Sequence, residues 1–191
     1  MIWDEENLVK VLKDGGVAVI PTDNLYGILG RAQDSSTVER IYKIRKRSPE
    51  KPCIILIGDI SDLEKFSVNI SPEQKVLLQE YWSSGSVSII LDCTDEKFSY
   101  LHRGTHTLAF RLPMQAGLPV NTDLQKLLQE TGPLIAPSAN PEGLIPAQNI
   151  EEAKNYFGDS VDVYIDGGKI IGKASKIIKL HKDGSIDMLR P

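Results

Sequence analysis

The chain has 191 residues, of which 41% are hydrophobic and 25% are charged, a composition typical of a soluble globular protein. Its formal net charge of −4 argues against broad, non-specific nucleic-acid binding, which needs a surplus of Lys and Arg. Two cysteines do not encode a disulfide framework, and neither a secretory leader nor an apolar run of about 20 residues is present. We therefore expect a cytoplasmic protein without a membrane segment.

Helical and strand patterns alternate along the chain. Apolar spacing predicts helices over residues 4–14, 35–46, 61–66, 72–82, 121–130 and 150–157. Short apolar runs predict strands over 17–20, 53–57, 86–91, 107–112, 134–136, 161–165 and 176–180, with a polar loop over 21–27. Asp183-Gly184 is a hairpin turn, so the strand over 176–180 and the strand that follows this turn, the last two of the chain, should be antiparallel. This order predicts an α/β fold with a mixed sheet. No repeat or change of composition marks a boundary, so residues 1–191 are expected to form a single domain.

The positions of two arginines in predicted elements are compatible with a place in a cleft. Arg45 shares a helical face with the apolar residues Val38 and Ile41, although a basic helix end is also explained by the helix dipole. Thr107 and Arg111 share one face of a predicted strand, although an Arg near a strand end is often a surface residue. A guanidinium inside a cleft suits a phosphate or a carboxylate.

The turn Ser138-Ala139-Asn140 follows the short predicted strand over 134–136. Ligands of open α/β sheets bind beyond the carboxyl ends of strands, where such turns lie. The alternative is a plain turn whose hydroxyl and carboxamide bond their own backbone. Taken alone, the tripeptide leaves both interpretations open.

Two other patterns are rejected. The stretch from Gly167 to Ala174 nearly fits a P-loop, but Ala174 replaces the Mg²⁺-binding hydroxyl and the next residues alternate like a strand instead of forming a helix. His102, His106 and His181 lack a metal-type spacing with cysteines or carboxylates, so no metal site is predicted.

Several segments carry a family resemblance in chain order. They lie at 21–27 (PTDNLYG), 44–52 (IRKRSPEKP), 84–88, 107–113 (TLAFRLP), 132–140 (GPLIAPSAN), 175 and 189–191 (LRP). Together they resemble the threonylcarbamoyl-AMP synthase (YrdC-like) family across nearly the whole chain. The stretch over 132–140 is the closest match. The chain resembles a short form without the extra C-terminal domain of long members.

The resemblance implies a twisted open sheet with helices packed on it and a concave, positive pocket. It also implies a nucleotidyltransferase reaction in which L-threonine, bicarbonate and ATP give threonylcarbamoyl-AMP and pyrophosphate. Mg²⁺ would bridge the ATP phosphates. A downstream transferase would pass the threonylcarbamoyl group to an adenosine of tRNA, and weak contact of this chain with tRNA is a further implication.

The resemblance also assigns roles residue by residue. The implied catalytic residues are Arg45, Arg47, Ser138 and Asn140. The implied ATP-binding residues are Arg47, Lys51, Thr107, Ser138 and Arg190. The implied amino-acid-binding residues are Thr22, Asn24, Tyr26, Arg111 and Ser175, with Arg111 on the carboxylate.

Two alternatives remain. The basic 40–51 segment is compatible with an RNA-binding or ribosome-maturation module on the same fold, although the net charge opposes it. Asn24 and Lys176 stand where the family has Thr, which is compatible with a carbamoyl-adenylate enzyme that uses another amine.

Overall fold

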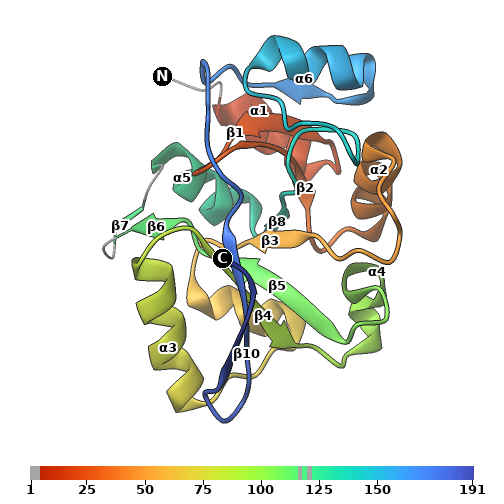
Figure 1. Cartoon of the computed structure of the whole chain (residues 1–191). Coiled ribbons are helices and arrows are strands. Elements are labelled where there is room, and N and C mark those ends of the chain that lie inside the picture. Colours follow the sequence, from red (N-terminus) through yellow and green to blue (C-terminus); the bar gives the residue numbers. More distant parts are fainter. Residues whose placement is uncertain (1–4, 116–117, 120–121) are drawn as a thin grey trace.

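Nine strands form one mixed sheet within the residues that the computed structural model describes, namely 5–115, 118–119 and 122–191 (Figure 1). In sheet order they are β11 (Ile186–Arg190), β10 (Lys176–Leu180), β4 (Val87–Asp92), β5 (Thr107–Arg111), β3 (Ile54–Leu56), β8 (Leu134–Ile135), β2 (Tyr26–Arg31), β1 (Ala18–Pro21) and β9 (Val163–Tyr164). The pairs β1–β9, β3–β5 and β4–β10 are parallel, and the others are antiparallel. Strands β6 (Met114–Gln115) and β7 (Leu118–Pro119) pair separately. The predicted α/β fold with a mixed sheet is confirmed, as is the antiparallel pairing of the last two strands.

The helices begin and end at recognisable signals. The α-helices are α1 (Glu5–Lys13), α2 (Ser35–Arg45), α3 (Pro72–Ser83), α4 (Ser99–His102), α5 (Thr122–Thr131) and α6 (Ile150–Phe157). Short 3₁₀ helices are η1 (Ile60–Phe66), η2 (Glu96–Phe98) and η3 (Gly158–Ser160). The Asp34 carboxylate caps α2 by accepting the first free N–H groups, and Ser71 caps α3 in the same way. Among the described helices, none has the length and apolarity needed to cross a membrane.

Two predicted elements differ from the structure, and α4 and β2 are among the observed elements that were not predicted. The helix predicted over 61–66 is a 3₁₀ helix, and α4 was not predicted. The loop predicted over 21–27 was wrong at both ends, because Pro21 ends β1 and Tyr26 begins β2, leaving a tight turn at 22–25. Strand β2 escaped prediction because all of its residues except Arg31 are buried, so it shows no alternation. Residues 4 and 121, at the start of two predicted helices, lie outside the described part.

The two faces of the sheet are covered unequally. On one face, a large core packs strand residues such as Ile55 and Phe110 against α2, α3, α4 and α6. On the opposite face, a smaller core packs Ile20 and Leu56 against α1 and α5, which lie side by side in Figure 1. Side chains alternate along each strand, so Arg111 of β5 emerges on the same face as Leu56. Helices α1 and α5 cover that face over β1, β2 and β8, and the candidate site lies beside them.

Candidate active site

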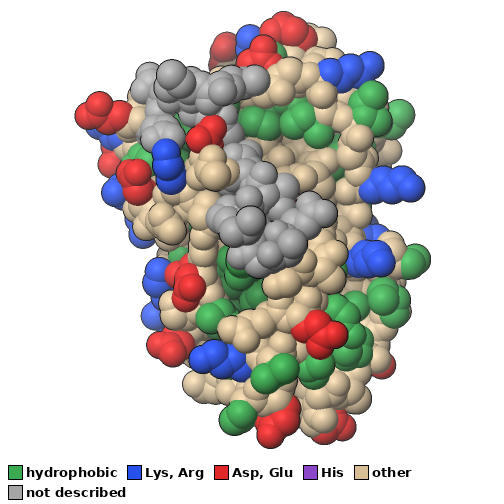
Figure 2. Space-filling view, turned by 90° about the vertical axis from the view of Figure 1, so that its left-hand side faces the viewer, with side chains coloured by type: hydrophobic (Ala, Val, Ile, Leu, Met, Phe, Trp, Pro, Cys, Tyr) green, Lys and Arg blue, Asp and Glu red, His purple; other side chains and the backbone are tan. Residues whose placement is uncertain are grey.

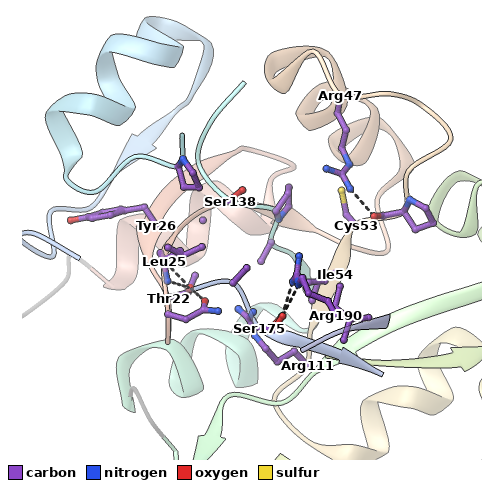
Figure 3. A pocket seen from close by; sticks show the side chains of 18 residues that line it. Thr22, Leu25, Tyr26, Arg47, Cys53, Ile54, Arg111, Ser138, Ser175 and Arg190 are labelled. Carbon is purple, nitrogen blue, oxygen red and sulfur yellow. Dashed lines mark hydrogen bonds between the residues drawn. The ribbon is translucent and has the colours of Figure 1, made fainter. Parts of the chain in front are cut away.

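A cavity of about 220 Å³ lies on the same sheet face as α1 and α5, over the part of that face that these helices do not cover (Figure 3). Its walls come from the β1–β2 turn, the 136–138 turn, the start of β3, the end of β5 and the segment before β10. The residues that line it are Thr22, Asn24, Leu25, Tyr26, Gly27, Arg47, Pro52, Cys53, Ile54, Arg111, Ala136, Pro137, Ser138, Pro146, Ala174, Ser175, Ile177 and Arg190.

The turn at 138–140 is held by its own side chains. The Ser138 hydroxyl donates to Asn140 Oδ1 at 2.6 Å, and Asn140 Nδ2 donates to the carbonyl oxygens of Pro141 at 2.9 Å and Leu144 at 2.8 Å. Asn140 is buried, whereas Ser138 lines the cavity. The plain-turn interpretation therefore holds for Asn140, which shapes the turn, and Ser138 is the member of the turn that lines the cavity.

Arg45 lies directly behind this turn. Its Nε donates to the Asn140 carbonyl at 2.9 Å, and its Nη2 lies 3.5 Å from the Ser138 hydroxyl. Burial, followed by the nearby charge of Arg47, lowers the pKa of Arg45 to about 10. The guanidinium still carries its charge at neutral pH, so it adds positive potential under the turn. The prediction that Arg45 continues the buried stripe of its helix is confirmed.

Arg47 reaches the cavity from the loop that follows α2. Its guanidinium donates to the carbonyl oxygens of Lys51 at 3.0 Å and Pro52 at 2.9 Å, which fixes the 47–52 loop around it. Lys51 itself does not line the cavity: its ammonium forms a short ion pair with Glu142, whose other oxygen accepts the Ser48 N–H at 2.5 Å. Hydrogen bonds from Lys51 and Ser48 hold the pKa of Glu142 below its usual range.

Arg111 and Asp23 form a buried ion pair at the end of β5. The distance from Arg111 Nη2 to Asp23 Oδ1 is 2.9 Å. Burial lowers the pKa of Arg111, and the Asp23 charge acts in the opposite sense. The Nε atom of Arg111 has no hydrogen-bond partner among the described residues. Arg111, at the end of the predicted face of Thr107, Ala109 and Arg111, thus lines the cavity, while its Nε atom is buried.

Arg190 and Ser175 close the side of the cavity formed by β10 and β11. Arg190 Nε donates to the Ser175 carbonyl at 2.8 Å, and Arg190 Nη2 lies 3.4 Å from the Ser175 hydroxyl. That hydroxyl also lies 2.8 Å from the Ser88 hydroxyl, and both serines are buried. Figure 3 shows Arg111, Arg190 and Ser175 close together, with Arg47 entering from another element. Burial also lowers the pKa of Arg190.

The segment over 166–175 lies against the β1–β2 turn and is held there by polar contacts. The Tyr26 hydroxyl accepts the Gly167 N–H at 2.7 Å and donates to the Gly168 carbonyl at 2.8 Å. Asn24 Nδ2 donates to the Lys173 carbonyl at 3.1 Å. A Cβ at Gly172 would lie 1.7 Å from the Asn24 carbonyl oxygen, so the backbones touch there. Gly167 and Gly172 of the rejected P-loop therefore serve close packing, whereas Gly168 has open space around it and a φ of 73°. The strand expected after them is β10.

The structure brings together most of the predicted site residues. Those that line the one cavity are Thr22, Asn24, Tyr26, Arg47, Arg111, Ser138, Ser175 and Arg190. Arg45 and Asn140 lie behind it. Thr107 is not brought there: it begins β5, and four residues at about 3.3 Å each separate it by roughly 13 Å from Arg111. Its hydroxyl bonds to the Thr105 hydroxyl at 3.1 Å instead.

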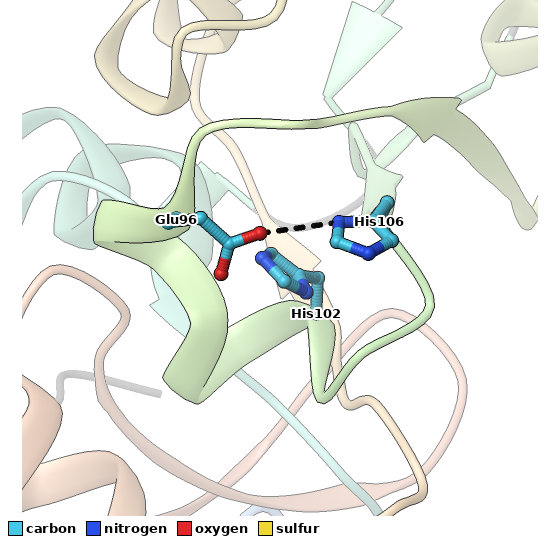
Figure 4. Close-up of side chains that lie close together, drawn as sticks. All are labelled: Glu96, His102 and His106. Carbon is cyan, nitrogen blue, oxygen red and sulfur yellow. Dashed lines mark ion pairs between the residues drawn. The ribbon is translucent and has the colours of Figure 1, made fainter.

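Sequence reasoning assigned no role to Asp23, Ser88 and Glu142, which contact site residues. Asp23 and Ser88 lie in motif segments, but their partners are distant in the sequence. The sequence argument about the histidines rested on spacing along the chain and predicted no metal site. Glu96, His102 and His106 bring their ligand atoms within 4.8 Å of one another, away from the cavity (Figure 4). Spacing along the chain does not reveal this proximity, because Glu96 and the two histidines meet through the bend between η2 and β5.

Chemically, the cavity is suited to anions. Arg47, Arg111 and Arg190 line it, and Arg45 lies beneath. Arg47 and Arg111 come from different elements, so two separate anionic groups could be held at once. Fixed guanidinium groups neutralise phosphate or carboxylate charge without reorganising in the reaction.

The fold and this cavity define an α/β protein with an arginine-lined cavity beside the helix-covered part of its sheet. The chain belongs to the Sua5/YciO/YrdC family, whose model, described as "Telomere recombination", matches residues 10–191. The resemblance noted in the sequence is therefore confirmed.

Named relatives carry the same resemblance. The threonylcarbamoyl-AMP synthase of Bacillus subtilis is 29% identical over 184 residues, covering 95% of this chain and 51% of the relative. The protein of that name from Pyrococcus abyssi is 28% identical over 191 residues, covering 99% and 54%. The chain thus spans about half the length of these two relatives.

Solved structures agree with the fold. P. abyssi Sua5 complexed with L-threonine superposes with a TM-score of 0.83 at 26% identity, covering 99% of this chain and 54% of that one. Escherichia coli YciO superposes with a TM-score of 0.80 at 26% identity, covering 97% and 87%. The twisted, open YrdC-like architecture expected from the sequence is confirmed.

Proposed function

We propose that this chain is an L-threonylcarbamoyladenylate synthase, a nucleotidyltransferase that makes threonylcarbamoyl-AMP and pyrophosphate from L-threonine, bicarbonate and ATP. The observation that carries the proposal is the placement of Arg47 and Arg111 on one cavity from separate elements. One guanidinium is available for the nucleotide and the other for the amino acid. The relatives' name and the L-threonine bound to P. abyssi Sua5 support this choice of substrates.

The chemistry needs no covalent bond to the protein. The threonine amine and bicarbonate give a carbamate and water. A carbamate oxygen then attacks the α-phosphorus of ATP in line, and pyrophosphate leaves with the bonding electrons. Catalysis by this site is therefore a matter of holding two anions in contact and neutralising charge as it moves.

The nucleotide half of the site uses Arg47, Ser138 and Arg190. Arg47 is held by two carbonyl oxygens, so its guanidinium is already oriented for phosphate. Arg45 and Asn140 act behind the turn, the first as fixed charge and the second by shaping the loop. The lining residues include no Asp or Glu, so Mg²⁺ would enter as part of MgATP, held by its phosphates. Lys51 joins this set when it leaves Glu142, whereas Thr107 has no place in it.

The amino-acid half uses Arg111, Thr22, Asn24 and Ser175. Arg111 lines the cavity, and a guanidinium suits a carboxylate. The Thr22 hydroxyl already donates to the Leu25 carbonyl at 2.7 Å, so it would offer a ligand its acceptor lone pair. Tyr26 lines the cavity and holds the segment over 166–175 in place through hydrogen bonds to Gly167 and Gly168.

We place the reaction in the cytoplasm, with residues 1–191 as a single domain carrying the activity. The buried free thiols of Cys53 and Cys93 fit a reducing compartment. The mixed anhydride product is reactive, so a downstream transferase acting on tRNA would consume it. On the face in Figure 2, basic and acidic side chains are interspersed among the described residues, which supports no more than weak contact with tRNA.

The test is pyrophosphate release by the purified chain with MgATP, bicarbonate and each amino acid in turn, with the adenylate identified by mass. Release that depends on both threonine and bicarbonate supports the proposal. Release with another amine instead would favour a different carbamoyl-adenylate enzyme. That candidate rests on Asn24, whose carboxamide bonds Lys173 and lies 3.3 Å from the Ser86 hydroxyl. No release with any amine would refute both.

A further inference from the structure

Glu96, His102 and His106 form a cluster at the end of β5 opposite the candidate active site (Figure 4). Glu96 begins η2, His102 ends α4, and His106 directly precedes β5. Glu96 and His106 are exposed, whereas His102 is 1% exposed. The cluster therefore has one fixed, buried imidazole and two ligands that solvent can reach.

The distances fit a shared ion better than a direct hydrogen bond. His106 Nδ1 lies 3.4 Å from Glu96 Oε1, which is longer than a well-formed charge-assisted bond. Two donors about 2.0–2.1 Å from a tetrahedral metal lie about 3.3 Å apart. The other separations are at most 4.8 Å, and rotation of the two exposed side chains can shorten them. We propose that Glu96, His102 and His106 bind one divalent transition-metal ion of the zinc type.

The buried imidazole of His102 supports the metal site independently of these distances. His102 Nδ1 accepts the Gly104 N–H at 3.2 Å, while His102 Nε2 is buried and has no partner among the described residues. A buried polar atom without a partner is costly, and one within ligand distance of a carboxylate and another imidazole has a natural occupant. Figure 4 shows a ring nitrogen of His102 turned towards the Glu96 carboxylate.

Metal binding at Nε2 requires that its proton leave. The ring can take the other neutral tautomer, with the proton on Nδ1, and the Gly104 N–H then gives up its acceptor. Gly104 is exposed, at φ 85°, and a Cβ there would meet nothing within 4 Å, so the turn has room to adjust. The weak 3.2 Å bond is a small loss against three metal bonds.

The donor set selects the class of ion. Two imidazoles and one carboxylate suit Zn²⁺ and its first-row neighbours, whereas Mg²⁺ and Ca²⁺ prefer oxygen ligands. Three protein ligands leave one coordination position for water. His106 directly precedes β5 and Arg111 ends it, and the strand from Thr107 to Arg111 spans roughly 13 Å, so the ion would lie outside the catalytic cavity. Its effect would be to tie η2 to the start of β5.

The experiment uses the full chain without a histidine tag, stripped of metal with a chelator. Zn²⁺ binding is measured by calorimetry, Co²⁺ binding by its visible spectrum, and thermal unfolding with and without Zn²⁺. We expect one ion per chain and a Zn²⁺-dependent rise in Tm. His106→Ala and Glu96→Gln, both at exposed positions, should each weaken Zn²⁺ binding by about tenfold or more and abolish the rise.

His181→Ala is the matched control, because His181 is a partly exposed histidine that pairs with Asp187 at 2.8 Å elsewhere. It should leave stoichiometry and affinity unchanged. Three results would overturn the proposal: no stoichiometric ion in the parent chain, unchanged binding in both His106→Ala and Glu96→Gln, or an equal loss in His181→Ala. These readouts do not depend on enzymatic activity.

Discussion

The Arg111 guanidinium lies 2.9 Å from the Asp23 carboxylate, and the two side chains are only 5% and 3% exposed. The pair joins the end of β5 to the β1–β2 turn across the floor of the cavity. It neutralises a buried cation, and within the described part of the chain the Nε atom of Arg111 has no hydrogen-bond partner. Asp23 therefore determines how much of the Arg111 charge is available to a ligand.

Removing the charge of Asp23 should destabilise the fold. Asp23→Asn leaves the Arg111 guanidinium buried without compensation, and breaking such a pair from one side costs about 3–5 kcal/mol. We expect a loss of about 3 kcal/mol in the free energy of unfolding in urea. Glu39→Gln, which removes a half-exposed partner of Arg103, should cost less than about 1 kcal/mol. Equal losses in the two variants would contradict the structural role of the buried pair.

Arg47→Ala tests the phosphate role. Loss of a positioned charge-stabilising group should lower kcat/KM for ATP by about 100-fold or more. The structure adds a stability cost, because Arg47 also bonds two carbonyl oxygens of its own loop, and we expect about 1 kcal/mol. Arg40→Ala is the control, since it removes a guanidinium that pairs with Asp162 on the surface. Near-normal turnover of Arg47→Ala in a pyrophosphate assay would refute the assignment.

Asp162 should contribute to the fall in the free energy of unfolding at acid pH. A hydrogen bond from Arg40 holds the pKa of Asp162 below the usual 3.8, and a bond from the Val17 N–H acts in the same sense. Since the folded-state pKa is the lower one, the contribution is fully present above pH 3.8 and is lost as pH falls through the folded-state value. Asp162→Asn should therefore flatten the fall in unfolding free energy below about pH 4. An unchanged slope between the two proteins would contradict this pKa direction.

Much of the fold followed from local pattern, and the exceptions have physical causes. Amphipathic helices such as α2 and α6 were predicted because one face of each packs on the sheet. Strand β2 was missed because it is buried on both faces and carries Gly27 and Gly30. A Cβ at Gly30 would lie 2.4 Å from the Thr37 side chain, so this glycine reflects helix packing across the strand.

Site residues could be predicted from the sequence only where they stand in a recognisable motif. Arg47, Ser138 and Arg111 stand in recognisable segments, and the structure brings them to one cavity. Asp23 lies in such a segment too, but its pairing with Arg111 joins residues 88 positions apart, which no local pattern reveals. The Glu96 cluster was missed for the same reason, since its members meet through a bend.

Glu142 offers a final test, because its carboxylate forms an ion pair with the Lys51 ammonium. Its two carboxylate oxygens contact the Lys51 ammonium and the Ser48 N–H, beside Arg47, much as two phosphate oxygens could. If Lys51 turns to ATP during binding, the pair with Glu142 must break first. Glu142→Gln keeps an acceptor for Ser48 but releases the charge on Lys51, so KM for ATP should fall by about threefold to tenfold.

The change should shrink at high salt, because exposed charges are screened. Glu151→Gln, which breaks the comparable exposed pair with Lys154, should leave KM unchanged. Lys51→Ala should raise KM for ATP and make it insensitive to a second change at Glu142. If Lys51→Ala and Glu142→Gln both leave KM unaltered, Lys51 only fastens the 47–52 loop, and the nucleotide is held by Arg47, Ser138 and Arg190 without it.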